Sequence, residues 1–143
     1  MLDIIHTALR QLPIFEHLDL KAHRNIIEKI ELMYYPAGYI IFQAGDEATD
    51  MYIVKSGEIE IFIEENGMRK GVAGITTGGF FGEMALIEET QRAASAEAMT
   101  DVEVFVITKD ILRDLMAAVP GLDMKLVEEY LRRKQENTGK HSL

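Results

Sequence analysis

The chain of 143 residues contains no cysteine, and none of its four histidines lies between Glu31 and Lys140. Without cysteine, neither a disulfide framework nor a thiolate metal site can form, and the composition fits a reducing compartment. A metal-dependent enzyme on a strand-rich scaffold needs several converging histidines and a carboxylate. No nucleophile is paired with a base either. We therefore predict that the protein is not an enzyme and holds no metal.

The chain also has few positively charged residues and few long apolar runs. The chain has 15 Lys and Arg against 24 Asp and Glu, which gives a formal net charge of −9. This charge opposes approach to nucleic acids and to anionic lipid surfaces. Charged residues interrupt the apolar runs, and the first residues lack the pattern of a signal peptide. We predict a cytoplasmic protein with no membrane and no nucleic-acid partner.

The N-terminal segment has helical spacing. Apolar residues recur at intervals of three and four up to Pro13, which predicts a helix over residues 2–12. Asp19 is a suitable N-cap for a second helix that reaches about Lys29. Both helices have an apolar face, so we expect them to cover a core rather than to carry chemistry.

From Glu31 onward the pattern changes to short extended segments separated by Gly38, Gly45, Gly57 and Gly67. Glutamates alternate with isoleucines over residues 58–64, the period of a strand with one face in a core and one in water. Many short strands with turns at this spacing predict a mainly β fold with flanking helices, of the sandwich or jelly-roll type. The predicted strands cover residues 31–35, 39–42, 51–55, 58–63, 70–75, 93–98 and 102–108.

Two further helices are predicted after the strands. Thr108 can cap the first of them, with Asp110 in its first turn. Pro120 suits the first turn of the second, which reaches about Lys134. The length fits a single domain. We predict one domain over residues 1–135, with helices at 1–30, a β-roll at 31–108, helices at 109–135, and a flexible tail at 136–143.

One stretch carries most of the functional information. Residues 80–95 read FFGEMALIEETQRAAS. Gly82, with Gly78 and Gly79 just before it, allows the backbone to bend tightly and to approach a ligand. The run from Glu83 predicts a short helical turn, whose first N–H groups suit a phosphate. Arg92 adds a guanidinium that can bind phosphate through two hydrogen bonds, and the Glu83 carboxylate suits a ribose hydroxyl. Phosphate and ribose together indicate a nucleotide.

The segments Phe81–Ile87 and Arg92–Ser95 resemble the phosphate-binding cassette of cyclic-nucleotide-binding domains. These domains occur in protein kinase A regulatory subunits and in the catabolite activator family. The segments 38–46 and 51–58 resemble the β-roll of the same family, a jelly-roll-like double-stranded β-helix. The resemblance implies that Glu83 holds the ribose 2′-hydroxyl and that Arg92 holds the cyclic phosphate. The site residues it implies are Phe81, Gly82, Glu83, Met84, Ala85, Leu86, Arg92, Ala93 and Ala94, with Tyr130 as a residue that could cap the base.

The resemblance implies a cyclic-nucleotide sensor, and cyclic AMP (cAMP) is the preferred ligand. A hydroxyl residue directly after the arginine would favour cyclic GMP (cGMP), and Ala93 has none, although Ser95 lies nearby. The apolar face of the last helix spreads over roughly 200°, wider than the ~100° that one core needs. Loops from the roll could cover the surplus apolar surface. Otherwise the resemblance implies that this helix closes over the bound base or packs against its twin in a homodimer, and so transmits the signal.

Three alternatives stay open at this point. The glycines could form only a turn, with Arg92 paired to Glu88 or Glu89 on the surface. The cassette could lack a ligand and serve as a protein-interaction domain. The chain could also be the regulatory fragment of a larger transcriptional regulator, kinase or transporter.

Overall fold

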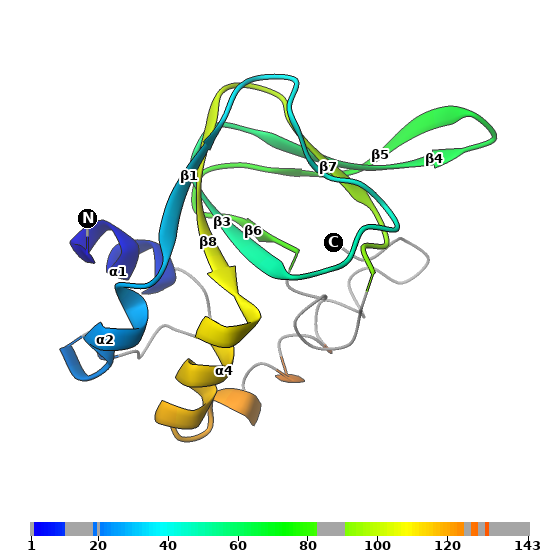
Figure 1. Cartoon of the computed structure of the whole chain (residues 1–143). Helices are drawn as coiled ribbons and strands as arrows, with labels where there is room; N and C mark the ends of the chain where they lie inside the picture. The colour runs from blue at the N-terminus through cyan, green and yellow to red at the C-terminus, as the bar shows by residue number, and fades with distance from the viewer. Residues whose placement is uncertain are drawn as a thin grey trace.

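The structure is a computed structural model that describes residues 2–10, 19, 21–82, 91–124, 127–128 and 131. Within these residues, two four-stranded antiparallel sheets face each other as a roll (Figure 1). The mainly β jelly-roll prediction is confirmed. One sheet has the order β1 (Glu31–Tyr35), β8 (Val102–Thr108), β3 (Asp50–Ser56), β6 (Phe80–Phe81). The other has the order β2 (Ile40–Phe42), β7 (Ser95–Ala98), β4 (Ile59–Glu65), β5 (Met68–Ile75).

The predicted strand positions agree with the structure, with one omission. Strands β1 and β8 have the predicted bounds, and the other predicted strands overlap their counterparts. Strand β6 was missed, because its two residues were assigned to the start of the cassette. Phe81 pairs with Tyr52 and Phe80 with Ile53, so β6 extends the first sheet at its edge. A strand of two residues is too short to show any alternation.

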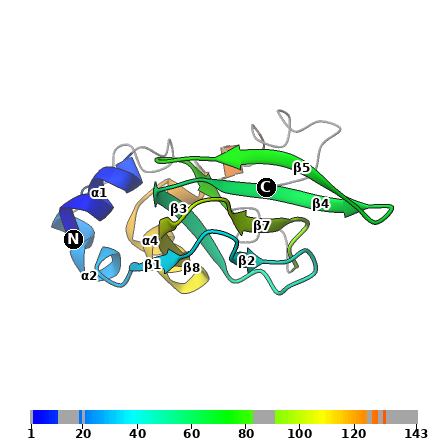
Figure 2. The ribbon, with the colours of Figure 1, turned by 90° about the horizontal axis from the view of Figure 1, so that it is seen from above.

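Two hydrophobic cores lie on opposite faces of the first sheet. Between the sheets, the alternating isoleucines of β4 pack against side chains from β3, β7 and β8. On the outer face, Met51 and Ile53 of β3 and Phe105 of β8 pack against the helices. Figure 1 shows these helices beside β1 and β8, and Figure 2 shows the β4–β5 hairpin extending away from α1 and α2.

The prediction for the second N-terminal helix needs a correction. Helix α1 (Leu2–Arg10) confirms the first N-terminal helix within its described residues. The second is shorter than predicted: a 3₁₀ turn, η2 (Lys21–His23), precedes α2 (Arg24–Ile27), and the residue at the N-cap position of α2 is His23 rather than Asp19. After Ile27 the Lys29 and Ile30 N–H groups bond to carbonyls three residues back, which tightens the helix and turns the chain into β1.

The C-terminal part agrees better. Helix α4 (Lys109–Ala118) begins at Thr108, whose Oγ1 accepts a hydrogen bond from the Ile111 N–H at 3.1 Å, as predicted. Beyond it, residues 122–124, 127–128 and 131 are helical, whereas Pro120 lies in the preceding turn. None of the described helices is long and apolar enough to cross a membrane.

Candidate functional site

The structure brings part of the predicted site together. Phe81, Gly82, Arg92, Ala93 and Ala94 lie within the described residues, at the end of β6 and just before β7. The remaining predicted residues, Glu83, Met84, Ala85, Leu86 and Tyr130, lie outside them. The geometry of the site therefore rests on Arg92 and its surroundings.

Arg92 is buried inside the roll, with only 6 % of its surface exposed. Its Nη1 donates a hydrogen bond to the Gly82 carbonyl at 3.1 Å, and its Nη2 donates one to the Asp50 carbonyl at 2.6 Å. A carbonyl oxygen accepts a hydrogen bond without neutralising a guanidinium, so these two bonds leave its positive charge in place. The alternative that Arg92 forms a surface pair placed its side chain at the surface, whereas the side chain is buried; Glu88 and Glu89 lie outside the described residues.

The backbone of Arg92 is fixed by the loop that follows β2. The Arg92 N–H donates to the Asp46 carbonyl, and the Gly45 N–H donates to the Arg92 carbonyl, both at 2.8 Å. The loop is itself closed by the Asp46 carboxylate, which accepts from the Gln43 N–H at 2.8 Å. These contacts determine where the Arg92 side chain begins and direct it into the roll.

Three aromatic rings, Phe42, Tyr52 and Phe81, form a cluster beside Arg92. The Arg92 Cζ lies 4.0 Å from the centroid of the Phe42 ring and 5.9 Å from that of Tyr52. The Tyr52 and Phe81 rings stack with centroids 4.9 Å apart, and each lies 6.0 Å from Phe42. Sequence reasoning assigned neither Tyr52 nor Phe42 a role at the site. Strand alternation predicts on which face of the sheet such a side chain lies, but not which side chains of other strands it contacts.

Burial makes the Tyr52 phenol a weaker acid than an exposed tyrosine. Its position in the roll raises the pKa of its phenol from 10.0 to about 12, and the nearby Asp50 carboxylate adds to the rise. The Arg92 guanidinium acts in the opposite direction, through its charge and a side-chain hydrogen bond. Tyr52 therefore stays neutral at physiological pH.

Gly78 and Gly82 have the positive φ of a tight turn, and their approach to a ligand stays a prediction. Gly82 has a φ of +80°, and a Cβ there would lie 2.9 Å from Arg92 Nη1 and 3.1 Å from the Asp50 carbonyl oxygen. Only glycine allows both the backbone conformation and the close approach of Arg92. Upstream, the turn at Gly78 and Gly79 is bonded to Val54 of β3 by two backbone hydrogen bonds of 2.8 and 2.9 Å.

Of the three small residues after Arg92, Ala93 and Ala94 precede β7 and Ser95 is its first residue. Ala94 is buried between the sheets, whereas Ala93 is exposed. The Ser95 hydroxyl accepts a hydrogen bond from the Ala44 N–H at 2.9 Å. Ser95 also lines a 460 Å³ cavity with Phe62, Glu64 and Arg69. Since successive side chains of a strand point to opposite faces, Ser95 points away from the side on which Ala96 packs between the sheets.

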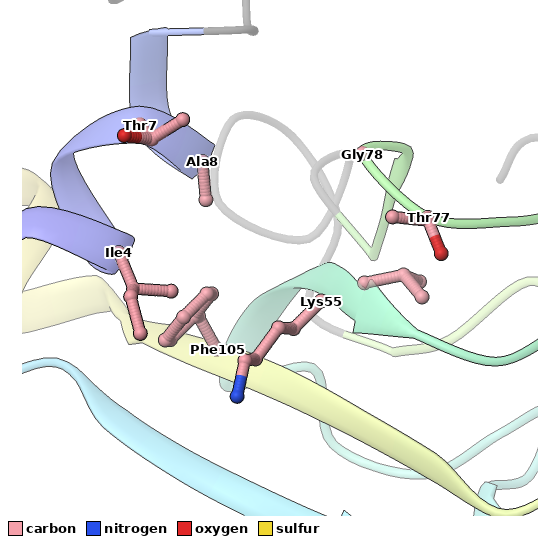
Figure 3. A pocket seen from close by; sticks show the side chains of 8 residues that line it. Ile4, Thr7, Ala8, Lys55, Thr77, Gly78 and Phe105 are labelled. Carbon is pink, nitrogen blue, oxygen red and sulfur yellow. The ribbon is translucent and has the colours of Figure 1, made fainter. Parts of the chain in front are cut away.

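A separate cavity of about 320 Å³ lies between α1 and the outer face of β3 (Figure 3). Ile4 and Ala8 of α1 face Phe105 and Lys55 across it, with the turn at Gly78 at its other end. The Lys55 ammonium lies 3.6 Å from the Glu103 carboxylate. This cavity shares no lining residue with the Arg92 cluster, so the predicted nucleotide site lies elsewhere. Among the described residues, no group of three or more histidines and carboxylates could hold a metal ion.

Comparison with known proteins gives a consistent result. A family model described as cyclic nucleotide-binding domain matches residues 32–119. The chain is 28% identical over 146 residues to a cAMP-dependent protein kinase regulatory subunit of Schizosaccharomyces pombe, covering 94% of this chain and 35% of that subunit. It therefore spans about a third of this relative's length.

Two solved structures have the same fold. The Thermus thermophilus catabolite activator protein aligns with a TM-score of 0.77 and 29% identity, over 87% of this chain and 59% of that one. The regulatory domain of Toxoplasma gondii protein kinase A, crystallised with cAMP, aligns with a TM-score of 0.75 and 26% identity, over 87% and 46% of the two chains. The family match covers more than half of the 143 residues and runs from Leu32 of β1 to just past the end of α4. The chain belongs to the cyclic nucleotide-binding domain family.

Proposed function

We propose that this domain binds cAMP and that Arg92 holds the cyclic phosphate. The observation that carries the proposal is a buried guanidinium, held by two carbonyl oxygens next to Gly82 at the start of the cassette. A guanidinium screened from water binds a phosphate more strongly than one at the surface, because the local dielectric is low. The related Toxoplasma gondii domain was crystallised with cAMP, which supports the same ligand class here.

Calorimetric titration of the whole chain with cAMP tests this function. We expect saturable binding with one nucleotide per chain. Absence of binding would overturn the proposal and would favour the alternative in which the cassette acts as a protein-interaction domain. We propose binding and regulation rather than catalysis. The domain could also be the regulatory part of a larger transcriptional regulator, kinase or transporter.

The rest of the cassette, Phe81 to Leu86 with Ala93 and Ala94, completes the proposed pocket. Glu83 is proposed to accept a hydrogen bond from the ribose 2′-hydroxyl. Glu83→Ala should therefore bind cAMP more weakly and should no longer distinguish cAMP from its 2′-deoxy analogue. If Glu83→Ala still prefers cAMP over the analogue as strongly as the unaltered chain does, the ribose contact is made elsewhere.

The position of Ser95 supports cAMP over cGMP. Ala93 has no hydroxyl, and the Ser95 hydroxyl is bonded to the Ala44 N–H on the far side of β7. Introducing a hydroxyl with Ala93→Thr should raise the affinity for cGMP relative to cAMP by about tenfold, the effect of one added hydrogen bond. Competition binding measures the ratio. An unchanged ratio would show that selectivity is set by other residues.

The C-terminal helical residues are proposed to transmit the signal. Leu122 is buried in the helical core, but Met124, Val127 and Leu131 are 62, 46 and 53 % exposed. Large apolar side chains at this spacing suit a partner surface, either the bound base, with Tyr130 as its cap, or the same helix of a second copy. Nucleotide would shift such a helix only through a higher affinity for one of its positions.

Truncation after Asp123 tests this proposal, because it keeps the buried Leu122 and removes the exposed apolar residues. A lid predicts weaker cAMP binding in the truncated chain, and a homodimer predicts a loss of dimer mass in sedimentation. Unchanged affinity together with an unchanged mass would overturn both roles.

A further inference from the structure

The Phe42 ring lies against the Arg92 guanidinium, and the proposed function gives no role to this contact. The distance from Arg92 Cζ to the ring centroid is 4.0 Å. We propose that Phe42 is a positioning residue for the nucleotide phosphate, because it holds the Arg92 guanidinium in one plane before the ligand arrives. This inference rests on the proposed function and names a residue through which the site achieves its affinity.

The first step concerns geometry. A guanidinium is a planar group with its donors in a fixed fork, so its orientation is set by its plane and by its rotation within that plane. A ring stacked at 4.0 Å restricts the plane. The bonds from Nη1 to the Gly82 carbonyl and from Nη2 to the Asp50 carbonyl restrict the rotation. Contacts from three parts of the chain together leave the fork little freedom, and a preorganised donor costs less entropy on binding.

The second step concerns charge. The face of an aromatic ring is electron-rich and attracts a cation without carrying a formal negative charge. A carboxylate in the same position would also hold the arginine, but it would repel the incoming phosphate. Phe42 therefore stabilises the buried cation in a way that stays compatible with an anionic ligand.

The third step concerns what holds Phe42. It lies near the end of β2 and contacts the Tyr52 ring of β3 and the Phe81 ring of β6, each with centroids 6.0 Å away. Tyr52 and Phe81 stack on each other at 4.9 Å. Because Phe81 directly precedes Gly82, the same cluster that supports Phe42 also leads into the cassette. The ring is thus fixed by strands from both sheets.

The chain offers a matched control. On the opposite face of the β2–β7–β4–β5 sheet, the Arg69 guanidinium stacks over Phe62 with its Cζ 3.7 Å from the ring centroid. This pair has the same two residue types and a similar geometry. It lies outside the roll, where Arg69 bonds to the carboxylates of Glu60 and Glu97.

The test compares Phe42→Leu with Phe62→Leu by calorimetric titration of the whole chain with cAMP. We expect Phe42→Leu to raise Kd by about tenfold, equivalent to about 1.4 kcal/mol, and Phe62→Leu to change it by less than about twofold. Phe42→Tyr, which keeps the ring, should retain most of the affinity. If Phe42→Leu does not fold, as judged by circular dichroism, Phe42→Met gives the same comparison with a flexible side chain of similar volume.

A double-mutant cycle separates positioning from a purely structural role. In the Arg92→Gln background the cation is absent, so adding Phe42→Leu should change the already weakened Kd by less than about twofold. An equal loss in both backgrounds would show that Phe42 only fills the core, and it would overturn the inference. So would an unchanged Kd for Phe42→Leu in the presence of clear wild-type binding. If the unaltered chain binds no cAMP at all, the proposed function itself fails, a result that is distinct from both.

Discussion

Two arginines of this protein stack on phenylalanines on opposite faces of one sheet, yet their surroundings differ. Arg69 lies over Phe62 outside the roll and bonds to the carboxylates of Glu60 and Glu97. Arg92 lies against Phe42 inside the roll, and its two hydrogen bonds described above go to carbonyl oxygens. The same pair of residue types therefore occurs once at the surface beside two acids and once in the buried interior beside two backbone carbonyls.

The difference bears on our proposal that Arg92, and not Arg69, binds the phosphate. The hydrogen bond to Glu97 raises the pKa of Arg69, and the contact with Glu60 adds to the rise. Partial burial acts in the opposite direction and lowers this pKa. A second anion at Arg69 would meet two carboxylates that already repel it. At Arg92 the two described side-chain acceptors are carbonyl oxygens, which carry no net charge to repel a phosphate. We propose that this difference in acceptors, more than the aromatic contact, makes Arg92 the better phosphate site.

The largest expected effect comes from adding one methyl group next to the inner arginine. Gly82→Ala places a Cβ at a φ of +80° and 2.9 Å from Arg92 Nη1. We expect it to lower the free energy of unfolding by about 3 kcal/mol, from backbone strain and a disturbed buried hydrogen bond. Urea unfolding measures the loss.

Gly45 provides the control for this substitution. It has a φ of +92°, and an added Cβ would meet nothing within 4 Å. Gly45→Ala should therefore cost only the strain, about 1–2 kcal/mol. Equal losses at the two glycines would show that the close approach of Arg92 to Gly82 contributes nothing to stability.

A smaller effect is expected at alkaline pH, from the phenol of the aromatic cluster. Burial raises the pKa of Tyr52 from 10.0 to about 12, so the folded state holds this proton more tightly than the unfolded state does. The resulting stability is complete below pH 10 and is lost as the pH rises towards 12, by at most about 2.7 kcal/mol. Urea unfolding of the wild type and of Tyr52→Phe between pH 9 and 11.5 isolates this contribution, because other groups titrate in both. Parallel profiles would contradict the burial of an ionisable phenol beside Arg92.

The smallest effect is expected at the outer arginine. Arg69→Met keeps much of the cover over Phe62 and removes the ion pairs with Glu60 and Glu97. Exposed ion pairs contribute little and are screened by salt, so we expect a loss of about 0.5–1 kcal/mol that shrinks in 1 M NaCl. Unfolding at low and high salt checks this. A salt-independent loss above about 2 kcal/mol would mean that the outer cluster is a buried network comparable to the inner one.

The comparison also shows what the sequence specified and what it did not. Alternation and glycine spacing predicted the strands, and the cassette pattern predicted that Arg92 matters. These signals are local. The carbonyls that accept from Arg92 belong to Gly82 and to Asp50, which is 42 positions away, and backbone acceptors have no signature in side-chain identity. Contacts between Phe42, Tyr52 and Arg92 depend on how β2, β3 and the segment before β7 meet, which hydrophobic period alone does not determine.

Local rules also failed where tertiary packing determines the backbone. Asp19 is a good N-cap by residue type, but α2 begins five positions later, after a 3₁₀ turn. N-cap preference says which residue types suit the start of a helix. It does not determine the position at which the helix starts, which depends here on where the chain enters the first sheet. Similarly, β6 has two residues and owes its existence to pairing with β3.

The central claim is that the buried arginine, and not its exposed counterpart, holds the phosphate. Side-by-side calorimetric titration of Arg92→Ala and Arg69→Ala with cAMP tests it most directly, with Arg92→Gln as a second variant and circular dichroism to establish folding. We predict that removing Arg92 raises Kd by at least tenfold, since loss of a desolvated charge contact costs about 2–5 kcal/mol, and that removing Arg69 changes it by less than about twofold. Unchanged cAMP binding by folded Arg92→Ala, or equal losses at the two positions, would contradict the claim.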